Sequence, residues 1–282
     1  MEKRKLGKTG ESLTIVGFGG MVVAGEEQDT ANCYVAKAVE ERGVNYFDVA
    51  PSYGNAEERL GPALEPYRDS VFLACKTGRR DAKGAEEELR QSLKRLHTDH
   101  FDLYQFHAVS SMDDVDKITG ANGALETFLR AKKEGLVRFI GFSAHSEDAA
   151  IALMNRFDFD TILFPFNWVC WYQKNFGPRV LEKAQEKGLG ILALKTLAKR
   201  RCKDGETHKW NKSWYVPVDN PEEASLAFRF TLSKPITAGT SPSHAELLWW
   251  MCDAADDFSH LSAEEALELK ERSNGLEAIF PH

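Results

Sequence analysis

Short apolar segments alternate with segments of helical periodicity along the whole chain. The helical segments repeat apolar residues at intervals of three and four, as Leu89, Leu93 and Leu96 do. The apolar segments are runs of Val, Ile, Leu and Phe without polar alternation, which is typical of parallel strands covered on both faces. We predict eight such strands, at residues 13–17, 45–49, 71–75, 101–106, 137–142, 161–166, 189–194 and 235–239.

This alternation predicts the fold class. Eight successive strand–helix units fit an α/β fold of the (β/α)8 type, the TIM barrel. Residues 4–6 and 13–15 flank a Gly-Lys-Thr-Gly turn and predict an N-terminal β-hairpin that covers the floor of the barrel. No linker, repeat or charge run divides the chain, so we predict one domain over residues 1–282.

Helix boundary signals agree with this assignment. Asp29 is placed to cap the first helix, and Pro178 and Gly188 are placed to begin and end a later one. Ser262 followed by Glu265 is a capping-box sequence, which predicts an extra helix at the C-terminal end.

Two long segments, 107–121 and 196–219, carry no predicted helix or strand, and loops of this length are usually functional. A short basic run at 199–203 either meets cofactor phosphates or is a solvated loop. Aromatic residues in the loops after the sixth and seventh strands either line a substrate pocket or pack into the core. These aromatic residues are Trp168, Trp171, Tyr172, Trp210, Trp214 and Tyr215.

Composition and charge narrow the class of protein. The chain has 36 Lys plus Arg against 43 Asp plus Glu, a formal net charge of −7, and no long basic block of the kind that nucleic acid binding requires. No segment approaches the roughly 20 consecutive apolar residues of a membrane span, and the N-terminus lacks the apolar core of a signal peptide. We therefore expect a cytoplasmic protein with neither a nucleic-acid nor a membrane partner.

No metal site is expected. The five cysteines are scattered singly without metal-ligand spacing, and His97 and His100 lack a third ligand. Cys75 adjoins Lys76, but strand alternation should turn its side chain away from the barrel interior.

Reactive residues stand at the ends of three successive predicted strands. Asp48 ends the second strand and Tyr53 follows in its loop, while Lys76 and His107 end the third and fourth. The carboxyl ends of barrel strands meet at one rim, where barrel enzymes carry their active sites. Each residue alone would more readily be structural, but together at adjacent strand ends they indicate a catalytic site.

This set of side chains suits proton transfer to or from an oxygen atom. A phenol has a pKa of about 10 in water, and Lys76 beside Tyr53 would stabilise the phenolate and lower that pKa. Asp48 would hold the Lys76 ammonium in place, and His107 would orient a carbonyl. None of these residues supplies a hydride, so a reduction would require a nicotinamide cofactor.

The same residues resemble the aldo-keto reductase family. The resemblance rests on the block DVAPSYGNAEERLG at 48–61, on Lys76 and His107, on GFGG at 17–20 and on GTS at 239–241, and it extends over nearly the whole chain. It implies an NAD(P)H-dependent reductase of small-molecule aldehydes or ketones, with Tyr53 as general acid and Asp48, Lys76 and His107 as its partners.

The resemblance also implies a set of cofactor-binding residues. Ser143 and Asn167 would hydrogen-bond the nicotinamide carboxamide, and Lys195 would reach the pyrophosphate. The adenosine phosphate side would be held by Gly239, Thr240 and Ser241.

The chain departs from the family pattern at three places. Ala144 follows Ser143 where many members have Asn, and Leu194 stands where many members stack an aromatic ring on the nicotinamide. Residues 239–249 include no Lys or Arg for a 2′-phosphate, and only His244 is available there. NADP(H) is the favoured cofactor and NAD(H) the alternative.

Two other functions fit parts of this pattern. One is a regulatory subunit that binds NADP(H) with little turnover, and the other is a hydrolase or lyase that uses Lys76 as a Schiff-base amine. No heptad pattern or exposed apolar helix face predicts an oligomeric state.

Overall fold

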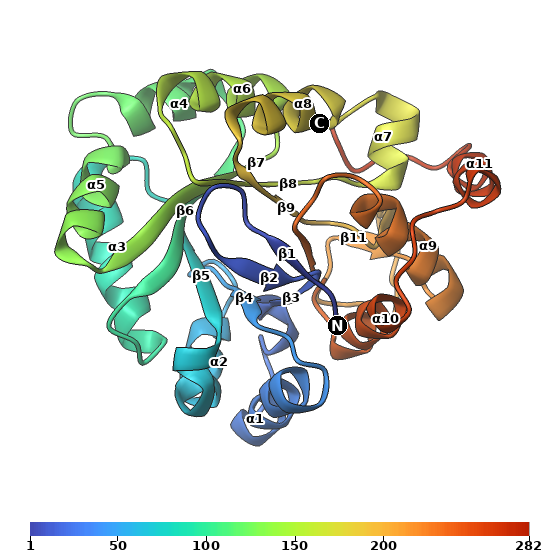
Figure 1. The fold of residues 1–282 in the computed structure, drawn as a ribbon, viewed down its shortest axis with the longest axis horizontal. Coiled ribbons are helices and arrows are strands. Elements are labelled where there is room, and N and C mark those ends of the chain that lie inside the picture. The colour runs from blue at the N-terminus through green and yellow to red at the C-terminus, as the bar shows by residue number, and fades with distance from the viewer. Residues whose placement is uncertain (282) are drawn as a thin grey trace.

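Eight parallel strands close into a barrel within residues 1–281, the part of the chain that this computed structural model describes (Figure 1). The strand order is β12-β3-β4-β5-β6-β7-β8-β9, with β12 paired to both β3 and β9. This confirms the predicted (β/α)8 fold. The barrel strands are β3 (Val16–Gly19), β4 (Tyr46–Asp48), β5 (Phe72–Thr77), β6 (Phe101–Val109), β7 (Val137–Ala144), β8 (Thr161–Phe164), β9 (Gly190–Ala193) and β12 (Ala238–Thr240).

Helices surround the barrel and connect its strands, with the extra helix α11 near the C-terminal end, as predicted (Figure 1). The α-helices are α1 (Gln28–Ala36), α2 (Ala56–Leu64), α3 (Ala82–Arg95), α4 (Met112–Thr119), α5 (Ala124–Glu134), α6 (Glu147–Arg156), α7 (Trp168–Lys174), α8 (Pro178–Lys187), α9 (Pro221–Leu232), α10 (Ala245–Asp256) and α11 (Ala263–Arg272). Shorter turns of other helix types are η1 (Gly20–Val22), η2 (Lys37–Glu41) and η3 (Glu65–Ser70).

Most of the predicted helix boundaries are confirmed. Pro178 is the first residue of α8, and Gly188 ends that helix in the left-handed conformation with φ 68°. The Ser262–Glu265 capping box is formed at the start of α11. The prediction for Asp29 was wrong, because α1 begins at Gln28 with extended Glu27 at the N-cap position, which leaves Asp29 inside the first turn.

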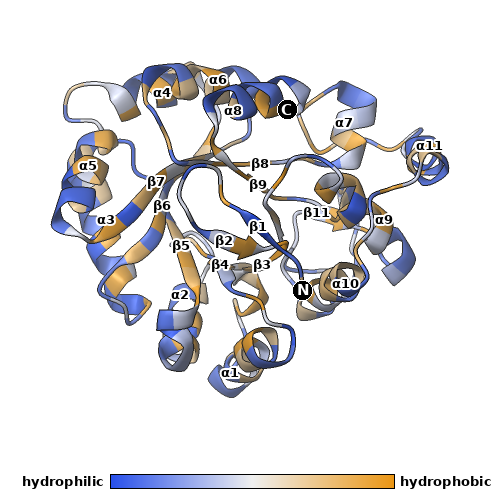
Figure 2. Cartoon of the chain, in the orientation of Figure 1, coloured by the Kyte–Doolittle hydropathy of each residue, from blue (hydrophilic) through white to orange (hydrophobic). Residues whose placement is uncertain are grey.

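Strand alternation divides the apolar core into two layers. One set of strand side chains faces the barrel interior, where Leu103 and Leu192 meet Leu6 and Leu13 from the N-terminal hairpin. The alternate set packs outward against the helices and includes Phe47. Figure 2 agrees, with mostly apolar barrel strands and polar outward-facing sides of the helices.

The first predicted strand is divided in the structure. β1 (Lys3–Lys5) and β2 (Ser12–Thr14) pair antiparallel as the predicted hairpin, with Arg4 opposite Leu13, and the barrel strand starts only at Val16. Figure 1 looks down on this hairpin, which lies across the barrel. The chain changes role at residue 15 because Leu13 fills the barrel floor, whereas Val16 packs outward against the helices.

Both segments predicted to be irregular contain regular structure. β6 continues to Val109, and α4 follows because the side chain of Ser111 accepts a hydrogen bond from the Asp114 backbone N–H. In the second segment β10 (Ala198–Arg201) and β11 (Tyr215–Pro217) pair as a separate antiparallel ribbon beyond the barrel. Their pairing partners are far apart in the sequence, so no local pattern indicated them.

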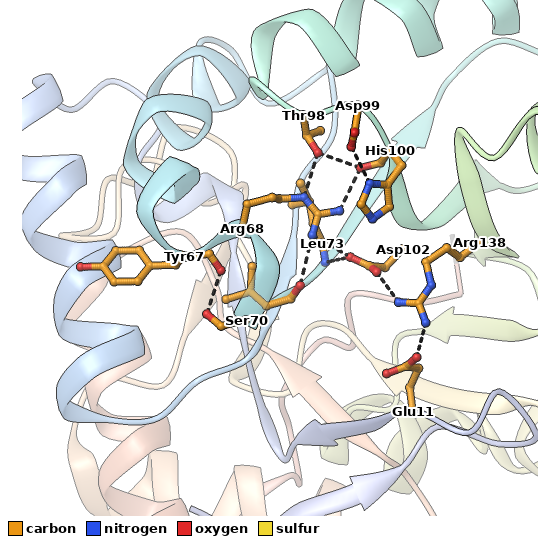
Figure 3. Close-up of polar contacts among 11 residues, drawn as sticks. Glu11, Tyr67, Arg68, Ser70, Leu73, Thr98, Asp99, His100, Asp102 and Arg138 are labelled. Atoms are coloured by element: carbon orange, nitrogen blue, oxygen red, sulfur yellow. Dashed lines mark hydrogen bonds and ion pairs between the residues drawn. The ribbon is translucent and has the colours of Figure 1, made fainter.

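An ion-pair network fixes the hairpin to the floor. Figure 3 shows the buried Asp102 carboxylate between the guanidinium groups of Arg68 and Arg138, with Glu11 on the far side of Arg138. Asp102 lies 3.1 Å from Arg68 Nη1 and 2.5 Å from Arg138 Nη1, and it accepts a hydrogen bond from the Leu73 backbone N–H at 2.9 Å. Arg138 also pairs with Glu11 of the hairpin, which links β6, β7 and the floor.

Within residues 1–281, no helix has both the length and the apolar character needed to cross a membrane.

Candidate active site

A cavity of about 300 Å³ opens at the C-terminal ends of the barrel strands, the end opposite to the hairpin. It is lined by residues from several strand ends and from the ribbon β10–β11. Those that the argument uses are Asp48, Tyr53, Lys76, His107, Ser143, Lys195, Trp214, Tyr215, Thr240 and Ser241.

Strand register brings the four predicted catalytic residues together. Asp48 of β4 pairs with Ala74 of β5, and Lys76 of β5 pairs with Gln105 of β6. Side chains two residues apart on a strand share a face, so His107 follows Gln105 toward the interior. Cys75 takes the opposite face and packs among the outer core residues, as predicted.

Asp48 and Lys76 form a buried ion pair at the base of the cavity. The second carboxylate oxygen, Asp48 Oδ2, accepts a hydrogen bond from Gln105 Nε2 at 2.9 Å and a longer one from the Tyr46 hydroxyl at 3.4 Å. Burial opposes the positive charge of Lys76, but Asp48 and Tyr53 outweigh it and raise the lysine pKa to about 12. Lys76 is therefore a fixed cation at neutral pH.

Tyr53 lies against this cation. Lys76 Nζ is 5.1 Å from the centroid of the Tyr53 ring, and the ring meets the His107 imidazole edge to face, with centroids 5.6 Å apart. The pKa of Tyr53 is raised, because desolvation outweighs the opposing effect of Lys76. The sequence-based expectation of a lowered pKa was wrong in sign, and the phenol is in its proton-donating form.

His107 is a neutral imidazole. Burial, assisted by the neighbouring positive charges of Lys76 and Lys195, lowers its pKa to about 2. Its Nδ1 lies 3.3 Å from the Ser52 hydroxyl, and its backbone carbonyl accepts a hydrogen bond from Arg80 Nη2 at 2.8 Å. When Ser52 donates to Nδ1, the ring carries its proton on Nε2 and can donate it to a substrate oxygen.

Four of the predicted cofactor-binding residues line the cavity. Ser143 is buried, and its hydroxyl oxygen accepts a hydrogen bond from the Ala108 backbone N–H at 2.8 Å. Thr240 and Ser241 line the opposite part of the rim, where Ser241 Oγ accepts from the Gly19 backbone N–H at 2.9 Å. Lys195 also lines the cavity.

Asn167 and Gly239 lie outside the cavity lining. The Asn167 amide is buried, where its oxygen accepts from two backbone N–H groups that start α7 and its nitrogen donates to the carbonyls of Lys195 and Ala198 at 3.0 and 2.5 Å. The Asn167 side chain therefore holds the turn after β9 through these hydrogen bonds. Gly239 is buried in the wall of the barrel.

Sequence reasoning missed the residues that hold the predicted catalytic side chains in place. Gln105 and Tyr46 contact Asp48, and Ser52 contacts His107. The signal for Gln105 was present, since it stands two residues before His107 and therefore shares its face of the strand.

The sequence left open whether the aromatic residues of the two loops line a substrate pocket or pack into the core, and the structure shows both. Trp214 and Tyr215 line the cavity, whereas Trp168 and Trp210 are buried in packing. The basic run after β9 is matched by acids: Lys199, Arg200 and Arg201 pair with Glu223, Glu206 and Glu277. Residues 1–281 contain no cluster of three or more His, Cys, Asp or Glu side chains arranged to hold a metal ion.

Comparison with known proteins decides the family. A family model described as the aldo/keto reductase family matches residues 15–261. The chain belongs to the aldo/keto reductase family. It is an oxidoreductase, and the relatives it matches carry oxidoreductase names.

Two relatives illustrate the extent of the similarity. The uncharacterized oxidoreductase YqkF of Bacillus subtilis is 32% identical over 181 residues, which cover 59% of this chain and 56% of that protein. L-galactose dehydrogenase of Arabidopsis thaliana is 28% identical over 254 residues, covering 84% of this chain and 78% of that protein. An aldo-keto reductase from Bacillus halodurans, solved in its holo form, shares the fold with a TM-score of 0.76 and 24% identity, covering 99% of this chain and 98% of its own.

Proposed function

We propose that this oxidoreductase reduces an aldehyde or a ketone to an alcohol with NAD(P)H, and that Tyr53 is the general acid. One observation carries the proposal: a protonated phenol lies in a cavity between a fixed lysine cation and a neutral imidazole. A donor that must deliver a proton needs to hold it in the resting site, and the raised pKa of Tyr53 meets that requirement.

The cavity suits a dinucleotide cofactor. It extends from Lys76 and His107 to residues 240–243, which lead directly into α10. The capping residue His244 makes no side-chain bond to the first turn of α10, and its carbonyl accepts from the Leu247 and Leu248 backbone N–H groups, so the N–H groups of Ala245 and Glu246 would be the ones to meet an anion. Ser143 would hold the nicotinamide end, and Thr240 and Ser241 the phosphate side, with NADP(H) favoured over NAD(H).

A bound nicotinamide supplies the hydride that adds to the carbonyl carbon. The phenol of Tyr53 donates its proton to the carbonyl oxygen in the same conversion, which yields a neutral alcohol. Lys76 stabilises the phenolate that remains, and Asp48 keeps Lys76 charged and in position. His107 donates a hydrogen bond that orients the carbonyl oxygen, and the phenolate recovers its proton from solvent after the product leaves.

Neither alternative function gains support from the geometry. A Schiff-base mechanism requires a neutral amine, whereas Asp48 and Tyr53 raise the pKa of Lys76 to about 12 and keep it protonated. A binding-only subunit does not require the Asp48, Tyr53, Lys76 and His107 arrangement that this cavity retains.

The test is the substitution Tyr53→Phe, which removes only the phenolic hydroxyl. We expect kcat for aldehyde reduction to fall by about a hundredfold or more, because general acid catalysis contributes on that scale. Binding of NADPH, measured by quenching of tryptophan fluorescence, should change little. Tyr67→Phe is the matched control, since Tyr67 lies outside the cavity with its hydroxyl on Glu40.

A Tyr53→Phe enzyme that kept its rate would remove the assigned role of Tyr53. Absence of turnover in the unsubstituted protein across a set of aldehydes and ketones, despite dinucleotide binding, would favour the regulatory alternative.

A further inference from the structure

Lys195 occupies a turn whose backbone is unusual and firmly held. It follows β9 with φ 65°, a left-handed conformation that costs a non-glycine residue energy. Its carbonyl accepts hydrogen bonds from Asn167 Nδ2 at 3.0 Å and from the Ala198 backbone N–H at 2.9 Å. The buried amide of Asn167 therefore fixes the turn that carries the Lys195 side chain along the cavity.

The ammonium of Lys195 lies between aromatic faces. Its Nζ is 4.8 Å from the ring centroid of Tyr215 and 5.1 Å from that of Trp214, both on the cavity wall. Cation–π contacts hold the Lys195 side chain between these two rings but do not neutralise its positive charge.

This cation has no acidic partner. Among the residues 1–281 that line the cavity, Asp48 is the one carboxylate, and it is paired with Lys76. Lys212, the remaining lining lysine, pairs with Glu26 at 2.6 Å. Lys195 forms no ion pair within the described chain, so the cavity carries one unmatched positive charge.

The position of this charge indicates what it would bind. It lowers the pKa of His107, and Lys76 contributes, after burial, to a Lys195 pKa lowered to about 8. Lys195 lines the same cavity as Tyr53, Lys76 and His107, so an anion bound at Lys195 would share that cavity with the reacting carbonyl. An unmatched cation in a partly desolvated cavity favours an anionic ligand, because such a ligand replaces the lost hydration.

We propose that Lys195 binds a carboxylate carried by the substrate, and that this enzyme prefers aldehydes or ketones that bear such a group. The inference rests on the proposed reductase function and adds the substrate class. Trp214 and Tyr215 flank the ammonium and offer flat apolar surfaces to the body of the substrate. A cofactor pyrophosphate is the other source of an anion for Lys195, and the experiment separates the two.

The experiment compares para-carboxybenzaldehyde with para-tolualdehyde, which have similar shapes but differ in charge. The protein should reduce para-carboxybenzaldehyde with a kcat/KM at least about tenfold higher than that for para-tolualdehyde, which is the scale of a hydrogen bond to a charged group. Lys195→Met should remove most of this preference, and Lys195→Arg should retain it. Lys203→Met is the control, since Lys203 is exposed and outside the cavity.

The outcomes are distinct. An unsubstituted enzyme that reduces both aldehydes with equal kcat/KM would overturn the substrate assignment and leave the reductase function standing, and this arm needs no variant to fold. A Lys195→Met enzyme that keeps the preference but binds NADPH more weakly would assign Lys195 to the cofactor instead. Reduction of neither aldehyde, with NADPH or NADH, would overturn the reductase function and this inference with it.

Discussion

At the residue scale, Gln105 contacts the proposed catalytic residue Asp48 without lining the cavity. It is buried behind Asp48 and donates to the carboxylate oxygen that Lys76 does not hold. We predict that Gln105→Leu lowers kcat by about tenfold, because a hydrogen bond to a charged group contributes about 1.5–3 kcal/mol and 1.36 kcal/mol is a factor of ten. Steady-state kinetics should show a smaller change in KM than in kcat.

Gln91→Leu makes the same chemical change at an exposed site on α3 and should leave the kinetics unchanged. If Gln105→Leu altered only thermal stability, with kcat preserved, Gln105 would be a packing residue rather than a positioning one.

Lys195 should make the use of anionic substrates dependent on pH. Its pKa is lowered to about 8 by burial and by Lys76, so the ammonium that attracts a carboxylate is present below that pH and lost above it. We predict that KM for para-carboxybenzaldehyde rises as the pH passes about 8. Profiles of KM against pH, for this aldehyde and for para-tolualdehyde, provide the measurement.

Three other titratable groups of the cavity hold their charge states over this range. Lys76 has a pKa of about 12, His107 one of about 2, and burial raises that of Tyr215 above its ordinary value. His145 also lines the cavity. Lys195→Arg separates these contributions, because arginine stays charged and should give a flat profile; a rise that persisted in this variant would assign the titration to another group.

At the scale of elements, one half-exposed arginine joins the N-terminal hairpin to a buried carboxylate of the barrel. Arg138 joins buried Asp102 to Glu11, while Asp102 keeps Arg68 and the Leu73 N–H as further partners. We predict that Arg138→Met lowers the free energy of unfolding by about 1–2 kcal/mol, less than for a carboxylate left wholly unpaired. Thermal unfolding should show Tm lower by roughly 2–8 °C.

Arg179→Met removes an arginine whose closer partner, Asp148, is 75% exposed and whose second pair, with Glu147, is long at 3.8 Å. This change should leave Tm nearly unchanged because surface pairs contribute little. Activity should persist in Arg138→Met, since the hairpin lies at the end of the barrel opposite to the cavity. An unchanged Tm in Arg138→Met would show that the other contacts of the hairpin, among them those of Leu6, Leu13 and Arg4, hold it without this ion pair.

At the scale of the whole molecule, cofactor binding should appear as stability. A ligand that binds only the folded protein stabilises it by about 2.7 kcal/mol at a hundred times its Kd. We predict that NADPH raises Tm by roughly 5–10 °C at that excess. The Tm shift with NADH at the same concentration gives the affinity for NADH relative to NADPH. This comparison measures how segment 239–249, which contains no Lys or Arg, affects the cofactor preference.

Thermal unfolding with either dinucleotide checks this, and AMP serves as a control that carries a phosphate without a nicotinamide. No shift with NADPH or NADH would remove the hydride source and with it the proposed reduction.

The sequence by itself determined the barrel and the strand ends that carry the proposed catalytic residues. Parallel strands that are covered on both faces need continuous apolar runs, so such runs in the sequence indicate the strands. Asp48, Lys76 and His107 were found because they end such runs, and the closed barrel brings strand ends to one rim.

Only the tertiary structure decided which neighbours these residues have. The sign of the Tyr53 pKa shift depends on burial outweighing Lys76, and the use of Asn167 to hold the Lys195 turn depends on hydrogen bonds between separate loops. The ribbon β10–β11 likewise forms from strands that pair across a long loop. Desolvation and non-local pairing are properties of the assembled chain, and no local sequence pattern records them.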